Sequence, residues 1–110
     1  MRGEDLAARH LTQLGYDVRH RNVRLPGGEI DIVAVAPDGT LAVVEVKTRR
    51  SAHFGGPLAA LTPAKYSRLR RLAAQYLNLY PHGAEVRIDV VGIVLRDDDA
   101  EITHLVGVQP

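Results

Sequence analysis

Charged residues interrupt two mainly apolar stretches of the sequence, and the types and spacing of three of them are compatible with metal-assisted chemistry. Asp31 lies within the stretch 28–35, and Glu45 and Lys47 lie within the stretch 41–48. Ionised side chains are rarely buried unless they are paired or bind a metal ion. Charged residues inside segments rich in valine and isoleucine therefore need a structural or a chemical explanation.

The short segment between the two stretches determines how these residues are placed. Pro37 suits the second position of a type I turn, and Gly39 suits the left-handed residue that follows. A three-residue hairpin loop with a glycine bulge would place Asp31 directly opposite Glu45, with both side chains on one face. A two-residue Asp-Gly turn would shift the register by one and separate the carboxylates. We favour the three-residue loop because proline pre-sets its first residue.

Two opposed carboxylates with a lysine nearby suit hydrolysis of phosphate esters. Carboxylate oxygens are good ligands for Mg²⁺ or Mn²⁺, and such ions are commonly held by one or two carboxylates together with substrate phosphate. The ion would polarise a phosphoryl oxygen and lower the pKa of a bound water. Lys47 would orient that water or stabilise the developing charge. The alternative is structural, with Lys47 neutralising Glu45 or Glu29 in a buried salt bridge.

The set formed by Asp31 and Glu45-Val46-Lys47 resembles the PD-(D/E)xK signature of the restriction-endonuclease-like nuclease superfamily, with Ile30 where a proline would precede the aspartate. The chain also resembles the YraN-like family, a small bacterial group related in fold to archaeal Holliday-junction resolvases. The most specific part of this resemblance is Glu-Val-Lys-Thr-Arg. The segments that carry the family resemblance are 3–8, 14–16, 28–31, 44–49, 62–65 and 87–91.

The resemblance implies a metal-dependent endonuclease that acts on nucleic acid, with DNA favoured over RNA and branched DNA as one candidate substrate. Asp31 and Glu45 would bind Mg²⁺ or Mn²⁺, with the carbonyl of Val46 as a further ligand, and Lys47 would be catalytic. Glu4 would assist the metal, because related resolvases carry an acidic residue on their first helix. The second hypothesis is a nucleic-acid-binding module that has this fold and does not cut.

Periodicity, capping and turn signals predict the elements that would position these residues. Their order, α-β-β-β-α-β-β, predicts a single α/β domain over residues 1–110 whose helices cover both faces of the sheet. The resemblance identifies the sheet as the mixed, restriction-endonuclease-like type. The helices are expected at 3–14 and 62–79, and the strands at 16–25, 28–35, 41–48, 86–95 and 101–108.

Helical spacing places Glu4 on the buried side of the first helix, where the helix dipole would stabilise its charge. Asp89 interrupts the apolar stretch 86–95, which is typical of a central parallel strand. We expect Asp89 to accept hydrogen bonds or to pair with a basic residue. The irregular alternation of the strand 16–25 is typical of an edge strand with charged side chains.

Basic residues gather in two places that follow the Glu-x-Lys strand. Arg49 and Arg50 begin the loop after it, and Lys65 and Arg68 lie in the first half of the second helix. Helix N-termini favour anions, so we predict that these residues contact the phosphates of a nucleic acid. The alternative is a set of solvated charges that aid solubility.

Composition excludes several classes of protein. The chain has 110 residues, no cysteine and a net charge of +1. The lack of cysteine excludes disulfides and thiolate zinc sites. No apolar stretch reaches the roughly 18 residues of a membrane span, and the first residues do not resemble a signal peptide. We therefore expect a cytoplasmic protein with no membrane partner, and both a monomer and a homodimer remain open.

Overall fold

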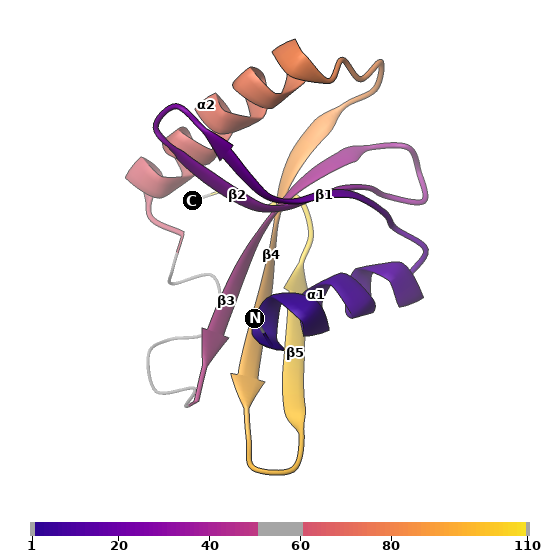
Figure 1. Cartoon of the computed structure of the whole chain (residues 1–110), viewed down its shortest axis with the longest axis vertical. Coiled ribbons are helices and arrows are strands. Elements are labelled where there is room, and N and C mark those ends of the chain that lie inside the picture. The colour runs from indigo at the N-terminus through magenta and orange to yellow at the C-terminus, as the bar shows by residue number, and fades with distance from the viewer. Residues whose placement is uncertain (1, 51–60, 110) are drawn as a thin grey trace.

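The computed structural model describes residues 2–50 and 61–109, and the elements of these ranges follow the expected order (Figure 1). The helices are α1 (Arg2–Gln13) and α2 (Pro63–Leu79). The strands are β1 (Asp17–Leu25), β2 (Gly28–Val35), β3 (Leu41–Arg49), β4 (Val86–Leu95) and β5 (Ala100–Leu105). They form one sheet in the order β1-β2-β3-β4-β5, in which β3 and β4 are parallel and the other neighbours are antiparallel. The expected mixed α/β fold is confirmed.

The β2–β3 hairpin has the predicted three-residue loop. The amide of Ala36 donates to the carbonyl of Thr40 at 2.8 Å, and Gly39 has a φ of 90°, which favours glycine. The paired residues run from Val35–Leu41 to Ile32–Val44. This register, continued by one residue, places Asp31 opposite Glu45, as the turn chemistry predicted.

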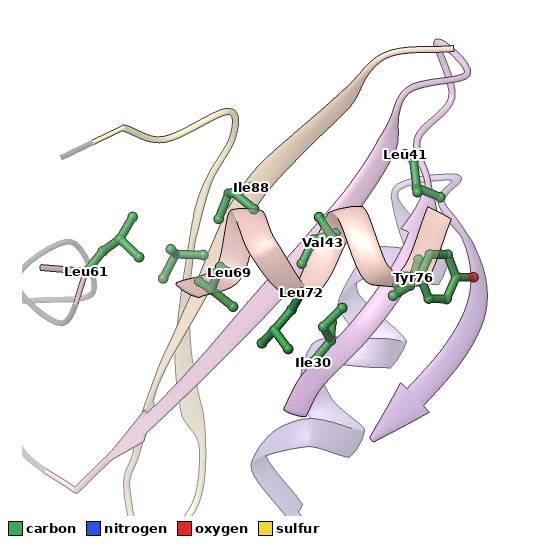
Figure 2. Packing of buried hydrophobic residues seen from close by; sticks show 11 residues of the cluster. Ile30, Leu41, Val43, Leu61, Leu69, Leu72, Tyr76 and Ile88 are labelled. Atoms are coloured by element: carbon green, nitrogen blue, oxygen red, sulfur yellow. The ribbon is translucent and has the colours of Figure 1, made fainter. Parts of the chain in front are cut away.

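The two helices cover opposite faces of the sheet. Buried residues of α1, including Leu11, pack with Ile32 and Val44 on one face. On the other face Leu69, Leu72 and Tyr76 of α2 pack against Ile30, Val43 and Ile88 (Figure 2). In the described ranges neither helix is long and apolar enough to cross a membrane.

Most element ends lie within one residue of the sequence-based expectation, and two of the differences have a clear structural cause. Helix α1 ends at Gln13, one residue early, and Gly15 follows with a φ of 90°. Strand β5 ends at Leu105 rather than at residue 108, because Gly107 adopts a φ of 61° and donates its amide to the Asp89 carboxylate at 3.0 Å. The chain therefore leaves the sheet to complete a hydrogen-bond network.

Candidate functional site

The sheet forks where Asp31 and Glu45 face each other. The pairing between β2 and β3 ends at Ile32–Val44. Beyond this point β2 pairs with β1 alone, and β3 pairs with β4 alone as far as Arg49. Figure 1 shows the two strands diverging, with β2 turning toward α2. The fork leaves backbone groups of β3 without a neighbouring strand, and side chains can reach them there.

The side chain of Asp31 binds the first backbone amide of β3 that lacks a partner on β2. Its Oδ2 accepts a hydrogen bond of 2.8 Å from the backbone amide of Val46. The register of the hairpin, if it continued, would bring Val46 opposite Ile30. The carboxylate thus takes the place of a strand carbonyl, and this bond fixes its position beside Glu45.

Two lysines from different elements neutralise Glu45. Glu45 is 8% exposed, and its Oε2 lies 3.9 Å from the Nζ of Lys47. The same oxygen forms an ion pair with Nζ of Lys65, in the first turn of α2. That turn is capped by Thr62, whose Oγ1 accepts the amide of Lys65 at 3.1 Å. The start of α2 is therefore held against the fork.

Glu4 approaches the fork from the other face of the sheet. It is 5% exposed, and its Oε1 lies 3.5 Å from Nη2 of Arg21, which also donates to Asp5 at 2.7 Å. The preceding residue, Gly3, packs so closely on Thr48 that a side chain there would collide with the Thr48 hydroxyl. The N-terminus of α1 is therefore fixed next to the end of β3.

The carboxylates at the fork affect one another. The pKa of Asp31 is raised from 3.8 to about 6, chiefly by burial, and the hydrogen bond from Val46 opposes this shift. The negative charges of Glu45 and Glu4 raise it further, and Glu45 also favours protonated Asp31 as a hydrogen-bond partner. Mutual repulsion of this kind is relieved when a cation lies between the carboxylates.

The two lysines differ in how firmly they hold a proton. The pKa of Lys47 is lowered, first by its hydrogen bond with Lys65, then by burial and by the charge of Lys65. Burial also acts to lower the pKa of Lys65, but hydrogen bonds with Glu45 and Lys47 outweigh it and raise that pKa. Lys65 therefore remains the fixed cation, and Lys47 is the lysine that gives up a proton more easily.

The oxygen donors at the fork fit a small, hard divalent cation. Within residues 2–50 and 61–109 no three Asp, Glu or His side chains are grouped so that they alone could hold an ion. Asp31 and Glu45 supply two carboxylates, which is a common protein contribution to a Mg²⁺ site that water and substrate complete. A direct contact of Glu4 or of the Val46 carbonyl with the ion stays a prediction.

The predicted phosphate-binding residues lie in different positions around the fork. Lys65 lies within the site, on Glu45. Arg68, one turn along α2, is exposed, and its side chain passes beside Gly28 at the start of β2. Arg49 and Arg50 are exposed at the end of β3, and residues 51–60, which follow them, lie outside the described residues. Their contact with nucleic acid stays a prediction.

Asp89 belongs to a separate network on the face covered by α1. It is fully buried and accepts hydrogen bonds from Tyr16, Arg87, His104 and the amide of Gly107, at 3.0 to 3.2 Å. Burial acts to raise the pKa of Asp89, but the hydrogen bonds from His104 and Gly107 and the charge of Arg87 lower it overall. The expected hydrogen-bonding and ion-pairing role of Asp89 is confirmed.

Sequence reasoning missed two partners of the site. It predicted that Lys65 contacts phosphate but did not pair it with Glu45. It treated the charged side chains of the strand 16–25 only as a feature of an edge strand, whereas one of them, Arg21, reaches Glu4 on α1. No pattern in the sequence pairs these residues, because each pair joins two different elements of the fold.

Comparison with known proteins places the chain in a family. Residues 3–93 match the sequence model of the group described as "Uncharacterised protein family UPF0102". The chain is 50% identical over 109 residues to a UPF0102 protein of Mycobacterium sp. (strain JLS), covering 96% of this chain and 81% of the relative. It is 41% identical over 106 residues to one of Syntrophomonas wolfei, covering 96% and 91%. The chain therefore belongs to the UPF0102 family, the YraN-like group that its sequence resembles.

Proposed function

We propose that this protein is a metal-dependent nuclease of the PD-(D/E)xK superfamily that hydrolyses phosphodiester bonds in nucleic acid. The observation that carries the proposal is the fork itself. There the backbone pairing of β2 with β3 ends, and the Asp31 carboxylate accepts a hydrogen bond from the Val46 amide. The carboxylate lies beside Glu45 and a half-buried Lys47. A sheet that needed only stability would continue its pairing with apolar residues and would avoid placing a half-buried carboxylate beside a buried one.

The side chains at the fork have distinct roles in this proposal. Asp31 and Glu45 hold Mg²⁺ or Mn²⁺, which when bound supplies a Lewis acid for the phosphoryl oxygen and an activated water. Lys47, whose pKa is lowered, hydrogen-bonds the attacking water or the phosphoryl oxygen as negative charge develops. The attacking water loses a proton as its oxygen bonds to phosphorus. The bond from phosphorus to the leaving oxygen breaks, and the leaving oxygen takes up a proton from solvent to become a hydroxyl group.

The substrate contacts in this proposal lie on the basic surface around the fork. Arg49 and Arg50 are exposed cations at the end of β3, and Arg68 is an exposed cation on α2. Lys65 lies near the N-terminus of α2. Such residues bind phosphates without reading sequence. The family resemblance favours DNA over RNA, with branched DNA as a candidate substrate.

A second candidate function has one specific observation in its favour. Lys47 and Lys65 already neutralise Glu45, as they would in a nucleic-acid-binding module that holds no metal ion. That module would bind nucleic acid equally well with and without a divalent cation.

Incubation with a panel of labelled substrates separates the two candidates. The panel contains a four-way junction, linear duplex DNA, single-stranded DNA and duplex RNA, each with Mn²⁺, Mg²⁺ or EDTA. The nuclease proposal predicts cleavage of at least one DNA only in the presence of a divalent ion, and loss of that cleavage in Asp31→Asn. Binding of every substrate without cleavage in either metal would support the binding module instead. Asp98→Asn, an exposed aspartate of the β4–β5 turn, is the matched control.

A further inference from the structure

Strand β2 loses its regular alternation of faces at Asp31. Ile30 and Val33 both pack on the α2 side of the sheet, although residues three apart in a regular strand face opposite sides. Ile32, between them, packs on the α1 side. The alternation is therefore reset at Asp31, the residue whose carboxylate leaves the ladder.

Strand β1 resets its alternation at the same level. Arg21 faces α1, where it pairs with Glu4, and Val23 packs with the residues on the α2 side, although these two residues are two positions apart. Asn22, between them, has a φ of 54°, the only positive φ of a non-glycine residue in the described ranges. The pairs Arg21–Ile32 and Val23–Ile30 flank it, so Asn22 lies opposite Asp31.

We propose that Asn22 is a positioning residue for Asp31. Its left-handed backbone exchanges the faces of the sheet on which the following side chains of β1 lie. Strand β2 is paired with β1 on both sides of this point, so its side chains exchange faces at the same place. The register of the hairpin already places Asp31 opposite Glu45. The change at Asn22 moves the Asp31 carboxylate out of the alternating pattern and brings it to the amide of Val46. The consequence for metal binding rests on the proposed function, whereas the positioning of Asp31 does not.

The residue type at position 22 agrees with this role. Left-handed backbone is costly for most L-residues, and asparagine tolerates it better than any β-branched residue. The side chain of Asn22 is exposed, so packing does not dictate the residue at this position. We therefore attribute the left-handed backbone of Asn22 to its effect on the neighbouring strand β2.

Two substitutions at position 22 test the proposal, with Arg24→Val as a β-branched control on the same strand. Asn22→Gly keeps access to positive φ, and Asn22→Val opposes it. The first readout is the NMR coupling across the hydrogen bond between the Val46 amide nitrogen and the Asp31 carboxylate carbon. The second is the dissociation constant for Mn²⁺, measured from the electron paramagnetic resonance signal of the free ion.

We expect Asn22→Gly and Arg24→Val to keep the coupling and to bind Mn²⁺ within about twofold of wild type. Asn22→Val should lose the coupling and bind Mn²⁺ at least tenfold more weakly; if it does not fold, Asn22→Ala should show the same change to a smaller degree. Retention of both readouts in the folded valine or alanine variant would overturn the proposal, and so would their loss in Asn22→Gly. Absence of Mn²⁺ binding in the wild type would overturn the proposed function, and the coupling would still decide the role of Asn22.

Discussion

The Asp31 carboxylate accepts the backbone amide of Val46 at 2.8 Å, in the position that a carbonyl of β2 would otherwise take. This contact joins the two halves of the sequence motif, because Val46 is the middle residue of Glu45-Val46-Lys47. It also holds a carboxylate with a raised pKa at the point where the two strands part. The Asp31 side chain therefore helps to hold β2 and β3 together at the fork, where their backbone pairing ends.

The pH dependence of stability should reveal the raised pKa of Asp31. The folded pKa of about 6 exceeds the ordinary value of 3.8, so the folded state binds this proton more tightly than the unfolded state. The free energy of unfolding should therefore decrease as the pH rises from about 4 to about 6. Asp31→Asn should lack this decrease and be more stable than wild type at pH 7, by on the order of 1 kcal/mol after discounting for solvent screening.

Urea unfolding of wild type, Asp31→Asn and the exposed control Asp98→Asn, at a series of pH values from 4 to 7 in steps of about one unit, measures this contribution. The difference in free energy of unfolding between wild type and Asp31→Asn should change across this range, and the difference between wild type and the control should not. A constant difference for Asp31→Asn would show that this carboxyl titrates normally.

Removal of Lys47 should separate chemistry from stability. Lys47→Ala should lower the rate of cleavage by on the order of 10²–10³, as for loss of one electrostatic stabiliser of a transition state. Binding of nucleic acid should fall little. Because Lys65 also pairs with Glu45, the carboxylate keeps a partner and the melting temperature should change only slightly. Cleavage, binding and melting are compared with Arg96→Ala, which removes an exposed cation of the β4–β5 turn.

If Lys47→Ala folds and cuts as fast as wild type, Lys47 has no catalytic role. A large drop in melting temperature would instead indicate that Lys47 is mainly a structural counter-ion of the carboxylates.

Charge reversal on the basic surface should weaken nucleic-acid binding without regard to sequence. The double variant Arg50→Glu and Arg68→Glu removes two exposed cations near the fork. Each phosphate contact contributes roughly 0.9 to the slope of log affinity against log salt, so the slope should become shallower by about 2. Affinity is measured at several salt concentrations, with Arg96→Glu as the control. An unchanged slope would place the nucleic acid on another surface.

Substitution of Asp89 should affect stability and leave the fork intact. Asp89→Ala removes the acceptor of four hydrogen bonds and leaves Arg87 without its buried partner, so it should cost about 3–5 kcal/mol. Mn²⁺ affinity of the folded variant should stay within twofold of wild type. Lost metal binding with unchanged stability would assign Asp89 to the metal site rather than to the structural network.

The sequence predicted the main geometric relationship of the site because it is set locally. Pro37 and Gly39 determine the loop, the loop determines the register, and the register places Asp31 opposite Glu45. Helical spacing likewise placed Glu4 on the buried side of α1, where the structure has it.

The parts that could not be predicted depend on how distant elements pack. Lys65 pairs with Glu45 only because α2 crosses the sheet with its first turn at the fork. The irregular alternation of β1 was visible in the sequence, but its causes were not. These are a bulge between Val18 and His20 and the left-handed Asn22.

A titration of Mn²⁺, followed by the electron paramagnetic resonance of the free ion, measures whether Asp31 and Glu45 share one divalent ion. We expect one ion bound per chain in the wild type and binding at least tenfold weaker in Asp31→Asn and in Glu45→Gln. The variants Asp98→Asn and Glu85→Gln, at exposed positions, should bind Mn²⁺ as the wild type does. Equal Mn²⁺ binding in the wild type and in the double variant of Asp31 and Glu45 would contradict a site shared by these two residues.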